Sequence, residues 1–233
     1  MKKINIILSL ICLLAISSCE GFLDVTPTNQ ADSSTSVTSA ADAQVMINGL
    51  MSKMTSSNYY GRNFVLYGDT KGGDLTIYTA GFDDNMYYFA HRVEGGSQIG
   101  FWIRGYDCLL QANNIIQGIE ALKEEGTTGL DDMLGQALTL RALIHFDLVR
   151  LYGKPYNMDG GASYGVPVVT APVDAGEKPL RNTVKEVYDQ VVADLTKAAP
   201  LISKSKSNGY VNYYANQAIL GKVYMYMDNF SSA

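Results

Sequence analysis

Histidine, tryptophan and cysteine are scarce in this chain of 233 residues, which contains two, one and three of them. His91, His145 and the cysteines do not follow the Cys/His spacing of a zinc site, so we expect no metal centre and structural roles for both histidines. The sequence also lacks a GxSxG nucleophile elbow, an HExxH motif and a pair of acids in an apolar setting. We therefore expect neither a catalytic group nor a cofactor.

Basic residues are fewer than acidic residues. Lysine and arginine number 18 against 23 aspartates and glutamates, for a net charge of −5. Without residues 1–18, which carry two lysines and no acid, the net charge becomes −7. Because nucleic-acid binding depends on an excess of cations, this balance disfavours a nucleic-acid partner. Tyrosine, by contrast, is plentiful, with sixteen residues that each combine an apolar face with a polar tip.

The first 18 residues are organised like a secretory signal peptide. Lys2 and Lys3 precede an apolar run from Ile4 to Ile16, and small residues follow it. The run is too short to cross a bilayer of roughly 30 Å as a stable helix, and the alternative is a buried N-terminal helix. We interpret residues 1–18 as a signal peptide and expect the protein to be exported.

Cys19 follows two serines, an arrangement similar to the lipobox of bacterial lipoproteins, in which the cysteine is diacylated. Cys19 is therefore the predicted lipid anchor, and the small, polar residues 19–38 are expected to form a flexible tether. The alternative is an ordinary signal peptide, which would leave the protein soluble. Once the signal peptide and the lipidated cysteine are set aside, Cys108 is the one remaining thiol. We expect it to be buried, with no internal disulfide.

Residues 39–233 are expected to form one domain, whose first helix runs from the capping-box pattern Ser39–Asp42 to about Ser56. Residues 57–100 are rich in Gly, Tyr, Asp and Asn and show no sustained period. A loop of that length is usually functional or disordered, and its many aromatic residues argue against disorder. We interpret it as an irregular segment that supplies a ligand surface. The alternative is ordinary packing around the first helix.

Two long helices are predicted next, over residues 101–122 and 131–152. The second is apolar on more than one face, so we expect it to be packed on several sides. Arg141, His145 and Asp147 must then find partners inside the fold. The helical period turns Asp147 away from the other two, so we expect a polar seam between helices rather than a catalytic relay.

A loop with three prolines leads to a fourth helix, which begins at the capping box Thr183–Glu186. The last element begins near Tyr213. Its run Leu220–Tyr224, followed by Ala233, places Leu, Gly, Tyr and Ala at the offsets of a tetratricopeptide helix pair. We therefore expect paired antiparallel helices with solenoid-like stacking.

Small residues have a purpose in such a helix pair. Ala218 and Gly221 would let a neighbouring helix approach closely, and Tyr224 would fill the groove between them. Since the chain stops at Ala233, inside the expected second helix, we expect the domain to be incomplete at its C-terminal end. Together these patterns predict a mainly α fold of tetratricopeptide-like antiparallel helix pairs with long irregular loops.

Several separated segments carry a resemblance to a known family. They are Cys19–Pro27, Asn48–Leu50, Trp102 with Ala112–Ile116, Leu140–Gly153, Gly165–Pro167 and Arg181–Tyr188. Together they resemble the SusD/RagB family of outer-membrane nutrient-binding lipoproteins. The resemblance implies a helical protein on the cell surface, anchored in the outer membrane through Cys19, that acts as a lid over a SusC-like TonB-dependent transporter.

The same resemblance implies a glycan, or another nutrient, as the ligand. By analogy the binding residues of this part of the chain would be Asp69, Asp74, Tyr78, Arg92 and Trp102. Trp102 has a second interpretation, as the core anchor of the helix over residues 101–122. We expect no enzymatic turnover. The alternative function is a helical protein-interaction scaffold without a small-molecule site of its own.

Overall fold

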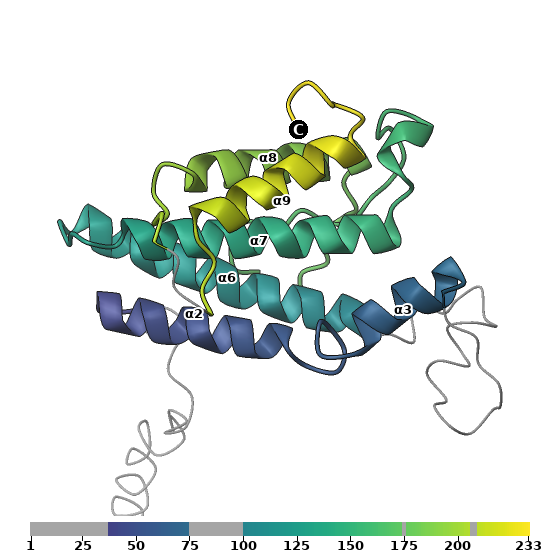
Figure 1. The fold of residues 1–233 in the computed structure, drawn as a ribbon. Helices are drawn as coiled ribbons and strands as arrows, with labels where there is room; N and C mark the ends of the chain where they lie inside the picture. Colours follow the sequence, from purple (N-terminus) through teal and green to yellow (C-terminus); the bar gives the residue numbers. More distant parts are fainter. Residues whose placement is uncertain (1–36, 75–99, 174–175, 206–208) are drawn as a thin grey trace, which may run out of the picture. The chain divides into compact units, whose positions relative to one another are not determined.

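The computed structural model describes residues 37–74, 100–173, 176–205 and 209–233, which belong to one compact unit spanning residues 34–233. The expected signal peptide, Cys19 and most of the expected tether lie outside these residues. Within them the regular structure is helical (Figure 1). The elements are α2 (Ala40–Met54), α3 (Asn63–Gly72), α6 (Phe101–Glu124), α7 (Asp131–Tyr152), a 3-10 turn (Tyr156–Met158), α8 (Val184–Ala198) and α9 (Tyr213–Tyr226). The predicted mainly α fold is confirmed.

The capping residues indicated by the sequence fix the N-termini of α2 and α8. Ser39 Oγ accepts a hydrogen bond from the Asp42 N–H at 3.2 Å, and Asp42 Oδ2 accepts one from the Thr38 hydroxyl at 2.7 Å. In α8 both bonds of a capping box are present. Thr183 Oγ1 accepts from the Glu186 N–H at 3.2 Å, and Glu186 Oε2 accepts from the Thr183 N–H at 2.7 Å. These contacts satisfy N–H groups that a helix leaves without an internal partner.

Helix α7 lies at the centre of this arrangement. In Figure 1 successive long helices alternate in direction, with α6 and α8 packed on α7, α2 packed on α6, and α9 packed on α8. Helices α6 and α7 come close at Gly105, where a Cβ atom would lie 3.0 Å from Leu148 Cδ2. Side chains are buried on several faces of α7, as its all-round apolar pattern predicts. None of the described helices is both long and apolar enough to cross a membrane.

The structure corrects the prediction of an irregular segment over residues 57–100. Helix α3 forms within it and is followed by Gly73, whose backbone is left-handed with a φ of 86°. This helix has no helical pattern in the sequence, because its apolar residues, Phe64 to Tyr67, are consecutive instead of spaced by three and four. Residues 75–99 lie outside the described residues, so the remainder of the predicted loop stays a prediction.

Helix α9 begins where the sequence predicts it, with Asn212 Oδ1 accepting from the Ala215 N–H at 3.0 Å. Residues 227–233, which were expected to enter the partner helix, form turns instead. The Cβ position of Gly221 has one neighbour within 4 Å, the carbonyl carbon of Ala233 at 3.8 Å, and Ala218 is exposed. Among the described residues no helix packs closely on these small residues, and their role in admitting one stays a prediction.

Candidate functional site

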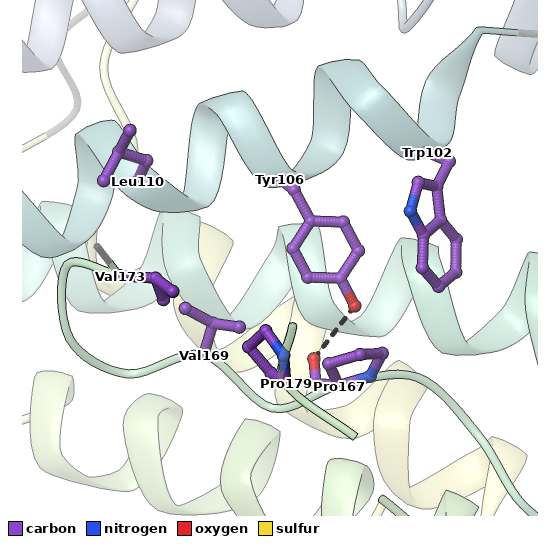
Figure 2. Close-up of a pocket in the computed structure, with 7 residues that line it drawn as sticks. All are labelled: Trp102, Tyr106, Leu110, Pro167, Val169, Val173 and Pro179. Atoms are coloured by element: carbon purple, nitrogen blue, oxygen red, sulfur yellow. Dashed lines mark hydrogen bonds between the residues drawn. The ribbon is translucent and has the colours of Figure 1, made fainter. Parts of the chain in front are cut away.

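A cavity of about 380 Å³ opens along α6. One side is formed by Trp102, Tyr106 and Leu110, which follow each other every four residues and so lie on one face of the helix. The other side is the irregular chain between α7 and α8 (Figure 2), which contributes Pro167, Val169, Val173 and Pro179. We call this cavity the Trp102 groove and residues 165–173 its wall segment.

Trp102 lies at the edge of the groove. Its ring centroid is 5.0 Å from that of Tyr106 and 5.0 Å from that of Tyr152, with interplanar angles of 51° and 84°. The residue is 37% exposed, whereas the neighbouring Phe101 is fully buried. Phe101 is thus the aromatic core anchor of α6, and the interpretation of Trp102 in that role is wrong. The indole is instead partly exposed at the edge of the groove.

Tyr106 joins the two sides of the groove. Its hydroxyl donates a hydrogen bond to the Pro167 carbonyl oxygen at 3.0 Å (Figure 2). Burial raises the pKa of Tyr106 well above its ordinary value of 10.0, so the phenol stays protonated and remains a donor at neutral pH. This bond fixes the wall segment against α6 at the point nearest to Trp102.

The lining of the groove is apolar and aromatic. A surface of this kind can pack against the C–H face of a ring-shaped ligand, but its lining residues include no acid, histidine or cysteine that could act as a nucleophile or general base. Cys108, on the same helix, is buried as predicted, and burial raises the pKa of its thiol to about 11. Among the described residues, no group of three or more His, Cys, Asp or Glu side chains could hold a metal ion.

One of the five residues predicted to bind ligand, Trp102, lines the groove. Asp69 lies on α3 and Asp74 follows that helix closely. Both are exposed and neither lines the groove. Tyr78 and Arg92 lie outside the described residues. The structure therefore does not bring the described members of the predicted set together around one cavity.

Sequence reasoning missed the other groove residues. Tyr106 and Leu110 carry a detectable signal, because they continue the four-residue spacing of Trp102 along α6. The wall segment carries no comparable signal. Pro167 and Val169 are placed by contacts with helices that lie far away in the sequence, and a local pattern cannot report such contacts.

Arg141 of α7 is the centre of a buried polar cluster behind the wall segment. Its Nε and Nη2 atoms donate to Asp194 Oδ2 and Oδ1 of α8 at 2.8 and 2.6 Å, and its Nη1 donates to Asn113 Oδ1 of α6 at 3.1 Å. His145 Nδ1 donates to the Arg141 carbonyl oxygen at 3.1 Å, and His145 Nε2 accepts from the Val169 N–H at 3.2 Å. We name these five residues the Arg141 cluster. They form the predicted polar seam between helices.

Asp147 belongs to a different cluster. Its Oδ2 atom accepts from the hydroxyls of Tyr59 and Tyr60 at 2.6 and 2.5 Å, and its Oδ1 atom accepts from the Arg150 guanidinium. Burial raises the pKa of the Asp147 carboxyl, although the Arg150 charge opposes this shift. We name these four residues the Asp147 cluster. Since Asp147 is separate from Arg141 and His145, the three form no catalytic relay, as predicted.

Comparison with known proteins places this architecture in a family. Residues 21–225 match the SusD-like family that is described as starch-binding and associating with the outer membrane. The chain belongs to the SusD-like family. SusD-like protein P2 of Formosa agariphila is 25% identical over 237 residues, a match that covers 100% of this chain and 45% of the relative.

Solved structures of SusD-like proteins share the fold. A SusD superfamily protein from Bacteroides thetaiotaomicron VPI-5482 has 33% identity and a TM-score of 0.70, over 83% of this chain and 44% of that chain. A laminarin-binding SusD-like protein has 19% identity and a TM-score of 0.61, over 83% of this chain and 41% of that chain, and this likeness concerns the fold alone. This SusD-like chain spans less than half the length of these relatives.

Proposed function

We propose that this SusD-like protein binds a glycan without transforming it, and that the Trp102 groove forms part of the binding site. The starch-binding description of the family supports a carbohydrate ligand. The observation that carries the proposal is a partly exposed indole at the edge of an apolar groove. Sugar rings present C–H faces that pack on such aromatic surfaces, while their hydroxyls need polar partners nearby.

The polar partners in this proposal are Asp69, Asp74, Tyr78 and Arg92. Carboxylates accept hydrogen bonds from sugar hydroxyls, and guanidinium and phenol groups donate to them. Asp69 and Asp74 are exposed at the end of α3, so both carboxylates are open to solvent. In this arrangement the groove supplies stacking and the acidic residues supply orientation.

The wider setting of the proposal is the cell surface. A lipid on Cys19 anchors the protein in the outer membrane, and the bound glycan passes to a SusC-like TonB-dependent transporter. The family description of outer-membrane association supports this location. The chain's pattern of two serines before Cys19 supports lipidation as the means of anchoring.

Affinity electrophoresis in gels that contain soluble starch or laminarin tests the proposal. The wild-type protein should be retarded in at least one gel, and Trp102→Ala should bind about tenfold more weakly because it removes the stacking surface. Tyr164→Ala is the matched control. Tyr164 is an aromatic residue that is 73% exposed and does not line the groove, so its loss should leave retardation unchanged. Equal retardation of all three proteins would exclude the groove as the site.

A protein-interaction scaffold is the second candidate function. The observation that favours it is that α9 and the turn after it expose large apolar side chains, those of Tyr214, Met225 and Phe230. Exposed apolar residues that gather on one side of a protein are typical of contact surfaces for other chains. Co-purification of the transporter with a protein that binds no glycan would favour this function over the first.

A further inference from the structure

The wall segment is bound along its backbone although it belongs to no sheet in the described residues. Three of its N–H groups have acceptors outside the segment. The Val168 N–H donates to Asn182 Oδ1 at 2.9 Å, and the Val169 N–H donates to His145 Nε2 at 3.2 Å. The Gly165 N–H donates to the Asn182 carbonyl oxygen at 2.7 Å. An irregular chain has many conformations open to it, and bonds of this kind select one of them.

The carbonyl groups of the wall segment are bound in the same way, by side chains of α6 and α7. Asn113 Nδ2 donates to the carbonyl oxygens of Val169 and Ala171 at 3.0 and 3.1 Å. Arg141 Nη1 donates to the Thr170 carbonyl oxygen at 3.0 Å. Three consecutive carbonyl groups are thus held by two side chains, both of which are buried.

These side chains are themselves fixed in orientation. Arg141 Nη1 donates to Asn113 Oδ1, so the other end of that amide, Nδ2, must face the wall segment. Asp194 holds the Arg141 guanidinium through two bonds. His145 donates from Nδ1 to the Arg141 carbonyl oxygen, which leaves Nε2 without a proton and able to accept from Val169. Each donor and acceptor that meets the wall therefore has one possible role.

We propose that Asn113, Arg141 and His145 are positioning residues that hold the wall segment in place and so set the width of the Trp102 groove before a ligand arrives. They touch no ligand, because they lie behind the wall. Their effect on binding comes through Val169, which lines the groove and whose N–H and carbonyl groups bond to His145 and Asn113. A wall held in one conformation binds more tightly than a mobile one, since less ordering remains to be done on binding. The effect of these residues on ligand binding rests on the proposed function, whereas their positioning of the wall segment does not.

The first test uses Trp102 as a reporter, because it is the one tryptophan of the chain. Asn113→Leu removes the donor to Val169 and Ala171 while keeping a side chain of similar size. In this variant the fluorescence emission maximum of Trp102 and its quenching by acrylamide should differ from those of the wild type. The far-UV circular dichroism should be unchanged. Unchanged emission and quenching would overturn the proposal.

Asn216→Leu is the matched control. Asn216 is as buried as Asn113, but its Nδ2 binds Thr139 Oγ1 at 3.0 Å and the Leu195 carbonyl oxygen at 3.2 Å, away from the wall segment. This variant loses the same kind of group and should lose stability, yet its Trp102 emission should match the wild type. If both variants shift the emission equally, the change reports general loosening and the positioning role fails.

A second measurement needs no variant. In the wild-type protein the amide hydrogen of Val169 should exchange with solvent as slowly as the amides inside α7, because it donates to the buried Nε2 atom of His145. Exchange as fast as that of the exposed turn residues Phe230 and Ser231 would overturn the proposal even if no Asn113 variant folds.

Binding then separates the two proposals. If starch or laminarin binds and Asn113→Leu weakens it at least tenfold with altered Trp102 emission, both stand. If the emission and exchange results are as expected but no glycan binds, the positioning role stands and the proposed function fails. If glycan binding and Trp102 emission are both unchanged in Asn113→Leu, the positioning role fails and the proposed function stands.

Discussion

The Arg141 cluster and the Asp147 cluster lie on the same helix, and both bury charged groups, yet they hold different kinds of structure. The Arg141 cluster reaches from α7 to α6, α8 and the backbone of the wall segment. The Asp147 cluster binds the hydroxyls of two tyrosines that precede α3, and its Arg150 side chain lies over the Phe146 ring at 4.5 Å. One cluster shapes a groove and the other closes a core. The difference shows that the partner of a buried charge, more than its burial, indicates its role.

Breaking the Arg141 cluster should have the largest effect. Arg141→Met should lower the free energy of unfolding by about 3–5 kcal/mol, because it leaves the Asp194 carboxylate buried without its counter-charge. Urea denaturation followed by circular dichroism would measure this change. The double variant Arg141→Met with Asp194→Leu should return most of the stability, since no unpaired charge remains. A double variant as unstable as the single one would show that the lost charge pair is not the cause.

The pH dependence of stability should distinguish the two clusters, because His145 belongs to the Arg141 cluster alone. Burial, with a smaller contribution from the Arg141 charge, lowers the pKa of His145 to about 4 from its ordinary 6.5. Between pH 6.5 and 4 this histidine is protonated in the unfolded chain but neutral in the folded protein. The free energy of unfolding should therefore fall by about 3 kcal/mol as the pH drops from 6.5 to 4. Above pH 6.5 the histidine contributes no slope. Urea denaturation across this pH range would measure it.

His145→Gln is the control for this pH effect. Glutamine can accept from the Val169 N–H but does not titrate, so this contribution to the slope should disappear while those of the carboxylates remain. If wild type and variant lose stability in parallel between pH 6.5 and 4, His145 is not kept neutral by the fold.

Weakening the Asp147 cluster should have the smallest effect of the three. Asp147→Asn keeps the shape and can still accept from a tyrosine hydroxyl, so we expect a loss of about 2 kcal/mol in the free energy of unfolding. Thermal denaturation would measure it. Because this cluster does not touch the wall segment, the exchange rate of the Val169 amide should change only as much as the loss of global stability requires. A selective increase at Val169 would show that the two clusters are coupled.

The sequence anticipated the helices whose signals are local. Capping patterns at Ser39 and Thr183 and apolar spacing located α2 and α8, and the same reasoning located α6, α7 and the start of α9. It missed α3, whose apolar residues are consecutive, and it expected a helix after α9 where turns are found. Both errors concern segments in which packing partners, rather than periodicity, decide the conformation.

For the candidate site, the sequence identified one residue of the groove. Trp102 was singled out through the family resemblance, but its neighbours Tyr106 and Pro167 were not. The polar residues of α7 were recognised as needing partners, because an apolar helix buries them whatever the fold. Their partners could not be named, since Arg141 meets residues that lie 28 and 53 positions away in the chain.

The sequence alone determined where most helices begin, which faces they bury, and that α7 must carry a satisfied polar seam. These features follow from interactions within a turn or two of chain, which residue spacing records directly. Only the tertiary structure decided that the seam would hold the wall segment and that this wall would face Trp102 across a groove. Such contacts join residues that are distant in the sequence, and they form only when the helices pack against one another.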